Sequence, residues 1–111
     1  MSEVNALEKQ YTDAKALIER RDIAIKLYSN PDFKKIILDG FCVHDCARYA
    51  QESQDPALTP AQQADALNIA QAAGHFRRYM SIVVQLGNHA ENQLSSIEEA
   101  IQELRMETGE G

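Results

Sequence analysis

Apolar residues recur at alternating steps of four and three along the C-terminal half of the chain, from Ile69 to Leu104. No polar residue interrupts this series. A spacing that averages about 3.5 residues is typical of a coiled-coil-like helix that packs along its length against another helix. We call the following positions the apolar seam: Ile69, Ala73, Phe76, Met80, Val83, Gly87, Ala90, Leu94, Ile97, Ile101 and Leu104.

A similar series near the N-terminus predicts a first helix over Ser2–Tyr28. The side chain of Ser2 is a suitable N-cap for this helix. Arg21 is the one residue that interrupts the series, and Leu17 and Ala24 widen the apolar stripe. The apolar positions are Val4, Leu7, Tyr11, Ala14, Ile18, Ile25 and Tyr28.

The segment Asn30-Pro31-Asp32 predicts the start of a second helix. A residue that precedes proline is disfavoured in the α region, so we expect Asn30 to be extended. An asparagine cap, a proline and an acidic residue together form a favourable helix start. We expect this helix to continue to Glu52. Gly40 lies inside it at a cost of about 1 kcal/mol relative to alanine, and indicates either a close helix contact or a local irregularity.

The segment from Ser53 to Leu58 is rich in turn-forming residues. Thr59 and Gln62 then have the spacing of a capping box, with Pro60 at the first helical position. We therefore predict a third helix over Pro60–Met106. Gly87 lies within this helix and has two interpretations of equal weight, a tight crossing with another helix or a hinge.

These elements predict a single all-α domain over residues 1–111. In the preferred arrangement, a kinked N-terminal arm (Ser2–Glu52) lies antiparallel to the C-terminal helix as a long helical hairpin, which places Val4 near Leu104. In the alternative, the chain reverses at Asn30-Pro31 and forms a three-helix bundle, which leaves the seam beyond Leu94 without a partner in the chain. A hairpin hides only one stripe per helix, so we expect self-association or docking on a larger assembly.

The chain has a formal net charge of −6 and an estimated pI of 4.9. This balance argues against general affinity for nucleic acids or anionic membranes, because both require a cationic surface. No apolar run approaches the roughly 20 residues of a membrane span, and the N-terminus does not resemble a signal peptide. We therefore expect neither a nucleic-acid nor a membrane partner. From residue 91 onward the charge is almost entirely acidic: Glu91, Glu98, Glu99, Glu103, Glu107 and Glu110, with Arg105 as the one base.

The string Cys42-Val43-His44-Asp45-Cys46 is the most metal-like part of the sequence. On a helix, Cys42 and Cys46 share a face while His44 points away from both, so one helix cannot arrange the three around a tetrahedral ion. The same spacing prevents a Cys–His nucleophilic pair. We predict no metal, no cofactor and no enzymatic activity, and keep as a third hypothesis a metal-dependent or redox protein that uses Cys42, His44 and Cys46. Two cysteines four residues apart favour a reduced, intracellular protein.

Arg77 and Arg78 have two interpretations. They either form a solvated helix face whose arginines pair with acidic residues of the neighbouring arm, or they bind an anion or an acidic partner. In the hairpin, Lys34 and Lys35 lie across from this region, and the four side chains would then form a basic girdle near its middle. Such a girdle would match an acidic surface on a partner.

The sequence resembles small helical proteins encoded by tailed bacteriophages. The resemblance lies in Asn30–Gly40 (NPDFKKIILDG), Ala47-Arg48, Asp55–Pro60 (DPALTP) and the region of Arg77-Arg78-Tyr79. It implies a phage-encoded, virion-associated protein that acts in the host cytoplasm during assembly. No site residues are defined by this resemblance, so none are transferred.

We therefore expect a non-catalytic structural or assembly protein that oligomerises or docks on a larger particle such as a phage head or its portal. The alternative is a phage-encoded regulatory protein that binds a host enzyme, such as RNA polymerase, through its acidic C-terminal helix. The candidate interface residues are Val4, Leu7, Tyr11, Phe76, Arg77, Arg78, Leu94, Ile97, Ile101 and Leu104.

Overall fold

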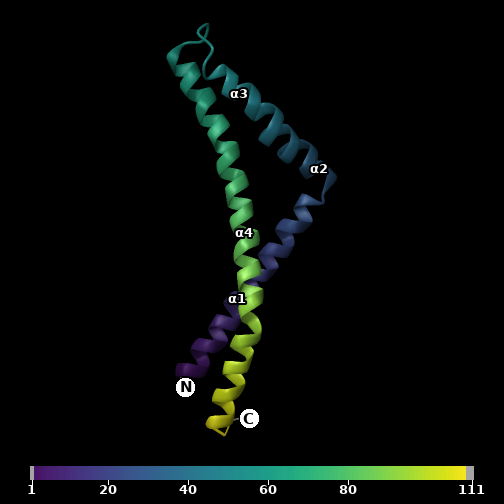
Figure 1. Ribbon diagram of the computed structural model, residues 1–111, viewed down its shortest axis with the longest axis vertical. Coiled ribbons are helices and arrows are strands. Elements are labelled where there is room, and N and C mark those ends of the chain that lie inside the picture. The colour runs from purple at the N-terminus through teal and green to yellow at the C-terminus, as the bar shows by residue number, and fades with distance from the viewer. Residues whose placement is uncertain (1, 110–111) are drawn as a thin grey trace. The chain divides into compact units, whose positions relative to one another are not determined.

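The computed structural model describes residues 2–109, and these residues form helices and turns without any strand. The chain is therefore all-α, as predicted. The elements in chain order are α1 (Ser2–Tyr28), α2 (Pro31–Phe33), the π-helix η1 (Lys34–Asp45), α3 (Cys46–Glu52) and α4 (Pro60–Glu107). Figure 1 labels the α-helices, and η1 lies between α2 and α3.

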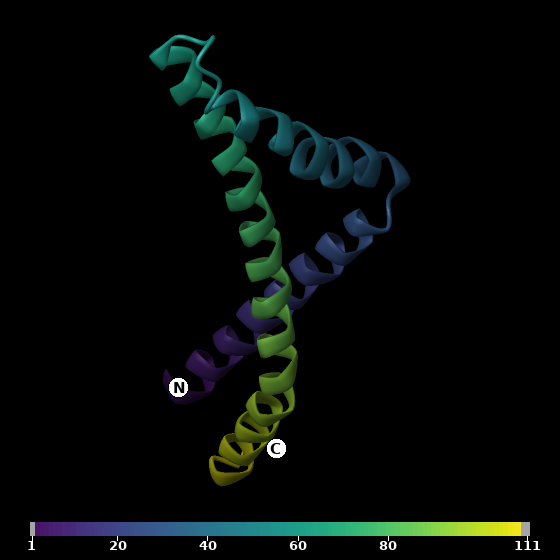
Figure 2. The same cartoon turned by 45° about the horizontal axis from the view of Figure 1, so that its top comes forward.

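The observed helix bounds follow the predicted ones closely. α1 covers the predicted first helix, and α2, η1 and α3 together cover the predicted second helix without a gap. α4 extends one residue beyond the predicted end and runs without interruption (Figure 2). The predicted capping role of the Ser2 side chain lies outside what the structure describes.

Both internal helix starts are formed as expected from their local sequence. Asn30 is extended (φ −77°, ψ 120°), and its Oδ1 accepts the backbone N–H groups of Asp32 and Phe33 at 2.9 and 3.0 Å. Thr59 and Gln62 form the reciprocal capping box. The Gln62 N–H donates to Thr59 Oγ1 at 3.2 Å, and the Thr59 N–H donates to Gln62 Oε1 at 3.0 Å.

Replacing Thr59 with alanine should therefore lower the free energy of unfolding by about 1 kcal/mol, because the Gln62 N–H loses its acceptor. Thr59→Ser keeps the hydroxyl and should remain close to wild type. Urea denaturation of the three proteins at one concentration measures the difference. Equal loss in both variants would show that the hydroxyl bond is not the source of the effect.

The second helix differs from the prediction in its middle part, because residues 34–45 form a π-helix rather than an α-helix. In a π-helix each N–H bonds to the carbonyl five residues earlier, and the Cys46 N–H closes this pattern on the Phe41 carbonyl. A Cβ added at Gly40 would lie 3.0 Å from the Lys35 carbonyl oxygen, also five residues earlier. Gly40 thus marks a local irregularity, where the missing side chain leaves room for the wider turn.

The contacts divide the chain into two compact units. Unit 1 comprises Met1–Ala24 and Ile82–Gly111, and unit 2 comprises Ile25–Ser81. In unit 1, α1 pairs antiparallel with the last part of α4, and its Glu8 forms an ion pair with Arg105 of α4. In unit 2, the first part of α4 packs against the η1–α3 segment. There the Cys46 thiol donates to the Ala70 carbonyl at 3.5 Å.

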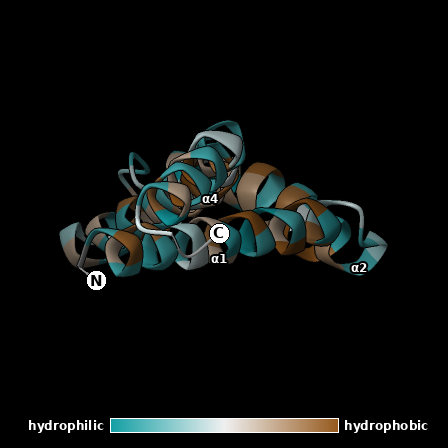
Figure 3. Ribbon diagram, turned by 90° about the horizontal axis from the view of Figure 1, so that it is seen from below, coloured by the Kyte–Doolittle hydropathy of each residue, from teal (hydrophilic) through white to brown (hydrophobic). Residues whose placement is uncertain are grey.

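The apolar seam forms the least exposed face of α4, as predicted, and hydrophobic and polar stretches alternate along the helices (Figure 3). The core is built mainly from small side chains. None of the large side chains among residues 2–109 is completely buried. The buried apolar residues are Ala14, Ala24, Cys42, Ala66, Ala73, Met80, Val83, Ala90 and Ile101.

The series on α1 departs from the prediction near its end. Ile25 was expected to face inward, but it is 48% exposed, whereas Ala24 is 4% exposed. The buried positions in this part of α1 are Ala14, Arg21 and Ala24, so the inward face continues from Arg21 by three residues rather than by four.

Candidate interaction surfaces

A tight helix crossing lies in unit 1, where Arg21 of α1 meets Gly87 of α4. A Cβ added at Gly87 would lie 2.1 Å from the Cβ of Arg21 and 2.8 Å from its Cγ, so no side chain fits there. Arg21 is only 8% exposed although it interrupts the apolar series. Of the two interpretations of Gly87, the structure supports the crossing.

The guanidinium of Arg21 is held by polar groups of both helices. Its Nη1 donates to Glu91 Oε2 at 2.6 Å and to Asn88 Oδ1 at 3.1 Å, and its Nη2 donates to Asp22 Oδ1 at 2.9 Å. The hydrogen bond with Glu91, followed by that with Asp22, raises the pKa of Arg21 above its ordinary value. The guanidinium is therefore paired with groups of both helices, and Arg21 joins α1 to α4.

The candidate interface residues lie mostly within the chain's own contacts. Ile101 is buried, and the pairing with α1 gives the seam beyond Leu94 a partner inside unit 1. Arg77 and Arg78 are exposed in unit 2 and take part in no ion pair among residues 2–109. The remaining candidates are half-buried: Val4, Leu7, Tyr11, Phe76, Leu94, Ile97 and Leu104.

Other large apolar side chains are exposed, with exposed fractions from 36% to 74%. The sequence analysis did not select them as interface residues, and it expected two of them, Ile25 and Tyr28, to face inward. Three of them, Tyr79, Ile82 and Leu86, recur at steps of three and four beside the seam. This spacing could have identified them from the sequence. Unit 1 contributes Ile23, Ile82, Leu86 and Met106, and unit 2 contributes Ile25, Leu27, Tyr28, Ile36, Val43, Leu67 and Tyr79.

One groove in unit 2 combines apolar side chains with two opposite charges. It has a volume of about 420 Å³. The ring of Phe76, which lines it, contacts Phe33 at a centroid distance of 6.3 Å, and Phe33 meets Tyr28 edge to face at the same distance. We call this the unit 2 groove, and its lining residues are Tyr28, Leu38, Asp39, Val43, Phe76, Arg77 and Ser81. Of the four residues of the predicted basic girdle, only Arg77 lines it.

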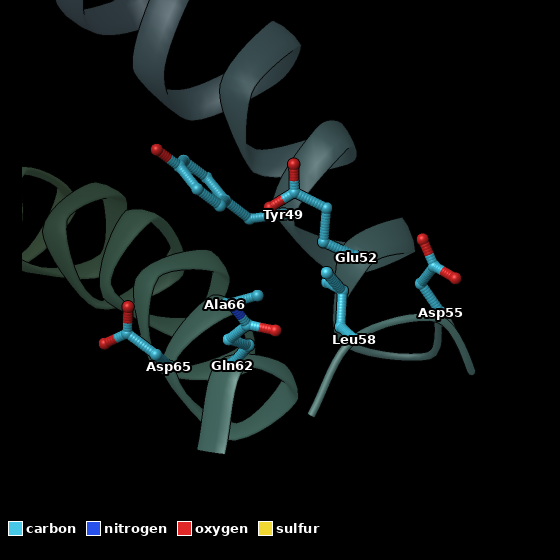
Figure 4. Close-up of a pocket in the computed structure, with 7 residues that line it drawn as sticks. All are labelled: Tyr49, Glu52, Asp55, Leu58, Gln62, Asp65 and Ala66. Carbon is cyan, nitrogen blue, oxygen red and sulfur yellow. The ribbon is translucent and has the colours of Figure 1, made fainter. Parts of the chain in front are cut away.

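A second hollow in unit 2 lies at the turn between α3 and α4, and has a volume of about 330 Å³. Three carboxylates line it, but those of Asp55 and Asp65 lie at opposite sides (Figure 4). Glu52 already pairs with Arg48 at 3.2 Å, and Asp55 Oδ1 accepts the Ala57 N–H at 2.9 Å. Asp55 therefore stabilises the turn, Glu52 is paired within α3, and this arrangement does not favour acid–base chemistry.

The Cys-Val-His-Asp-Cys string does not form a converging site. Cys42 is buried and Cys46 is half-buried, while His44 is exposed, so the three side chains do not share a face. Among residues 2–109, no group of three or more His, Cys, Asp or Glu side chains lies close enough to hold a metal ion.

Burial raises the pKa of the Cys42 thiol above its ordinary value of 9.0. In the unfolded chain this thiol ionises near its ordinary pKa, whereas the folded chain keeps the proton to higher pH. The stabilisation from Cys42 should therefore be fully present below about pH 9 and should decline as the pH rises further. Unfolding measured from pH 7 to pH 10 should show a shallower decline for Cys42→Ala than for wild type. Parallel declines would rule out this role of Cys42.

None of the helices among residues 2–109 is long and apolar enough to cross a membrane. Comparisons with known proteins found no matching family model, no matching curated protein and no matching solved structure.

Proposed function

We propose that this protein is a non-catalytic assembly protein that uses its exposed apolar side chains to associate with itself or with a larger protein assembly. The distribution of side-chain sizes carries the proposal. Alanine is the commonest residue in the core, whereas Ile36 is 65% exposed, Tyr79 54% and Ile23 52%. Exposing large apolar side chains while burying small ones leaves unfavourable contact with water, which association would remove.

We also propose that the two pairings belong to one long antiparallel hairpin rather than to a three-helix bundle. α4 is the partner of α1 in unit 1 and of the η1–α3 segment in unit 2, which favours two successive pairings along one helix. Spin labels at Lys9 and Gln51 test this. The labels should lie roughly 60 Å apart in the hairpin, from a rise of about 1.5 Å per residue. A distance under about 20 Å, as expected for adjacent helices, would favour the bundle.

The larger assembly that we propose is a phage virion, with the protein acting in the host cytoplasm during assembly. The sequence resemblance at Asn30–Gly40 supports this part of the proposal. Two measurements test the function together: the mass in solution by light scattering across micromolar concentrations, and mass spectrometry of purified particles. A chain that stays monomeric throughout and is missing from the particles would contradict it.

The charge distribution favours one alternative, a regulatory protein that binds a host enzyme such as RNA polymerase. Unit 1 contains eleven acidic residues and five basic ones, whereas unit 2 contains six of each. The carboxylates of Glu98, Glu99 and Glu103 are exposed on α4. Under this alternative the polymerase should be recovered from host lysate with the wild-type chain and lost when these three residues are changed to glutamine.

A further inference from the structure

We propose that the unit 2 groove is the contact between two copies of this chain, with Arg77 of each copy pairing with Asp39 of the other. This inference rests on the proposed function, because it names the partner that covers one exposed apolar surface. The groove offers both parts of a protein interface, an apolar floor and charged groups beside it.

The floor of the groove suits the side chains of another helix. Tyr28, Leu38, Val43 and Phe76 line it, and Val43 is 50% exposed. Phe76 is also in contact with the ring of Phe33, at a centroid distance of 6.3 Å. The groove therefore presents apolar area that is already held in place, so a partner would order few further side chains on binding.

The charges of the groove favour a second copy as the partner. Arg77 and Asp39 both line it, and neither takes part in an ion pair among residues 2–109. A two-fold contact brings the same patch of both copies together, so each Arg77 can meet the other copy's Asp39. A surface that carries one cation and one anion is complementary to itself, and does not select for an acidic or a basic partner.

The numbers of acidic and basic residues in the two units also favour a contact between copies through unit 2. Unit 2 has six acidic and six basic residues, so two copies of it do not repel each other. Unit 1 has eleven acidic residues against five basic ones, and two copies of unit 1 would repel. We therefore place the contact between copies on unit 2.

Charge reversal tests the pairing directly. Sedimentation equilibrium of the full chain should give a dissociation constant that rises about tenfold in Arg77→Glu and in Asp39→Lys, because each reversal turns two attractive contacts into two repulsive ones. The double variant restores both contacts with the charges exchanged. It should return to within about threefold of wild type, a recovery that simple loss of folding cannot produce.

Matched controls separate the groove from its surroundings. Arg78→Glu makes the same charge change at the next, exposed residue, which does not line the groove, and should leave the dissociation constant unchanged. Val43→Asp should weaken association, whereas Ile36→Asp, on a more exposed side chain outside the groove, should not. Circular dichroism should show the same helix content in all variants.

The outcomes distinguish this inference from the proposed function. If the wild type associates but neither Arg77→Glu nor Val43→Asp changes the dissociation constant, the groove is not the contact and the proposed function stands. If the wild type is monomeric yet binds a larger assembly, the pairing of copies is wrong and the proposed function stands. If the chain neither associates nor binds an assembly, both fail.

Discussion

Replacing Gly87 with alanine is expected to lower the free energy of unfolding by about 1–3 kcal/mol, because overpacking a tight contact costs this much. The new Cβ would lie 2.1 Å from the Cβ of Arg21, and that atom is fixed to the backbone of α1. The two helices must therefore move apart, and the bond from Arg21 to Glu91 would be strained or lost. This result opposes the usual effect of the substitution, since alanine is favoured over glycine within helices by about 1 kcal/mol.

Gly74 provides the matched control in the same helix. It is exposed, and a Cβ added there would meet no atom within 4 Å. Gly74→Ala should therefore raise the free energy of unfolding by about 0.5–1 kcal/mol. Urea denaturation of both variants, at one protein concentration so that association affects them equally, should give changes of opposite sign. A gain in stability in both variants would show that the helices do not cross closely at Gly87.

Replacing Ile101 with alanine should destabilise the protein by about 2–3 kcal/mol, the lower part of the range for truncating a large buried aliphatic side chain. Ile101 is 9% exposed within the pairing of α1 with the last part of α4. The loss combines the transfer of the side chain from the core with the cavity that it leaves. The variant thus measures how strongly α1 holds the C-terminal part of α4.

Met106 is the control for this second prediction, because it lies on the same helix and is 74% exposed. Met106→Ala should change the free energy of unfolding by less than about 0.5 kcal/mol, as is usual for surface positions. The same urea denaturation measures both. Similar small effects of Ile101→Ala and Met106→Ala would mean that this part of α4 is not held by α1.

Helix starts and helix lengths could be predicted because they depend on neighbouring residues. The cap at Asn30 and the box formed by Thr59 and Gln62 each need only side chains within three positions. The inward face of α4 was also predictable, since the spacing of apolar residues directly reports which side of a helix avoids water.

The Arg21–Gly87 crossing could not be predicted, because it depends on two residues 66 positions apart. In the sequence, Arg21 interrupts one apolar series, and Gly87 is a helix-destabilising residue in the other. Only the pairing of the helices shows that the Arg21 side chain lies against Gly87, where no other side chain fits. The unit 2 groove was missed for the same reason, since Tyr28, Val43 and Phe76 come from three helical segments.

The π-helix was missed because the apolar residues Phe33, Ile36, Ile37 and Phe41 recur at the three- and four-residue spacing that predicts an α-helix. Gly40 was noticed, but one glycine does not specify a wider turn. The exposure of Ile25 was missed because the predicted series continued from Ile18 to Ile25, whereas the buried position at this end of α1 is Ala24, three residues after Arg21.

The crossing at Arg21 also determines the register in which α1 and α4 can pair. A continuous apolar seam would otherwise allow the helices to slide past each other by seven residues at little cost. Such a slip would place Arg21 against Met80 or Leu94 in place of Gly87, and its cation would lose Glu91 and Asn88. A single polar residue in an apolar seam is a known means of selecting one alignment. Here Gly87, which has no side chain, is the position that leaves room for Arg21, so the register is selected by steric fit as well as by charge.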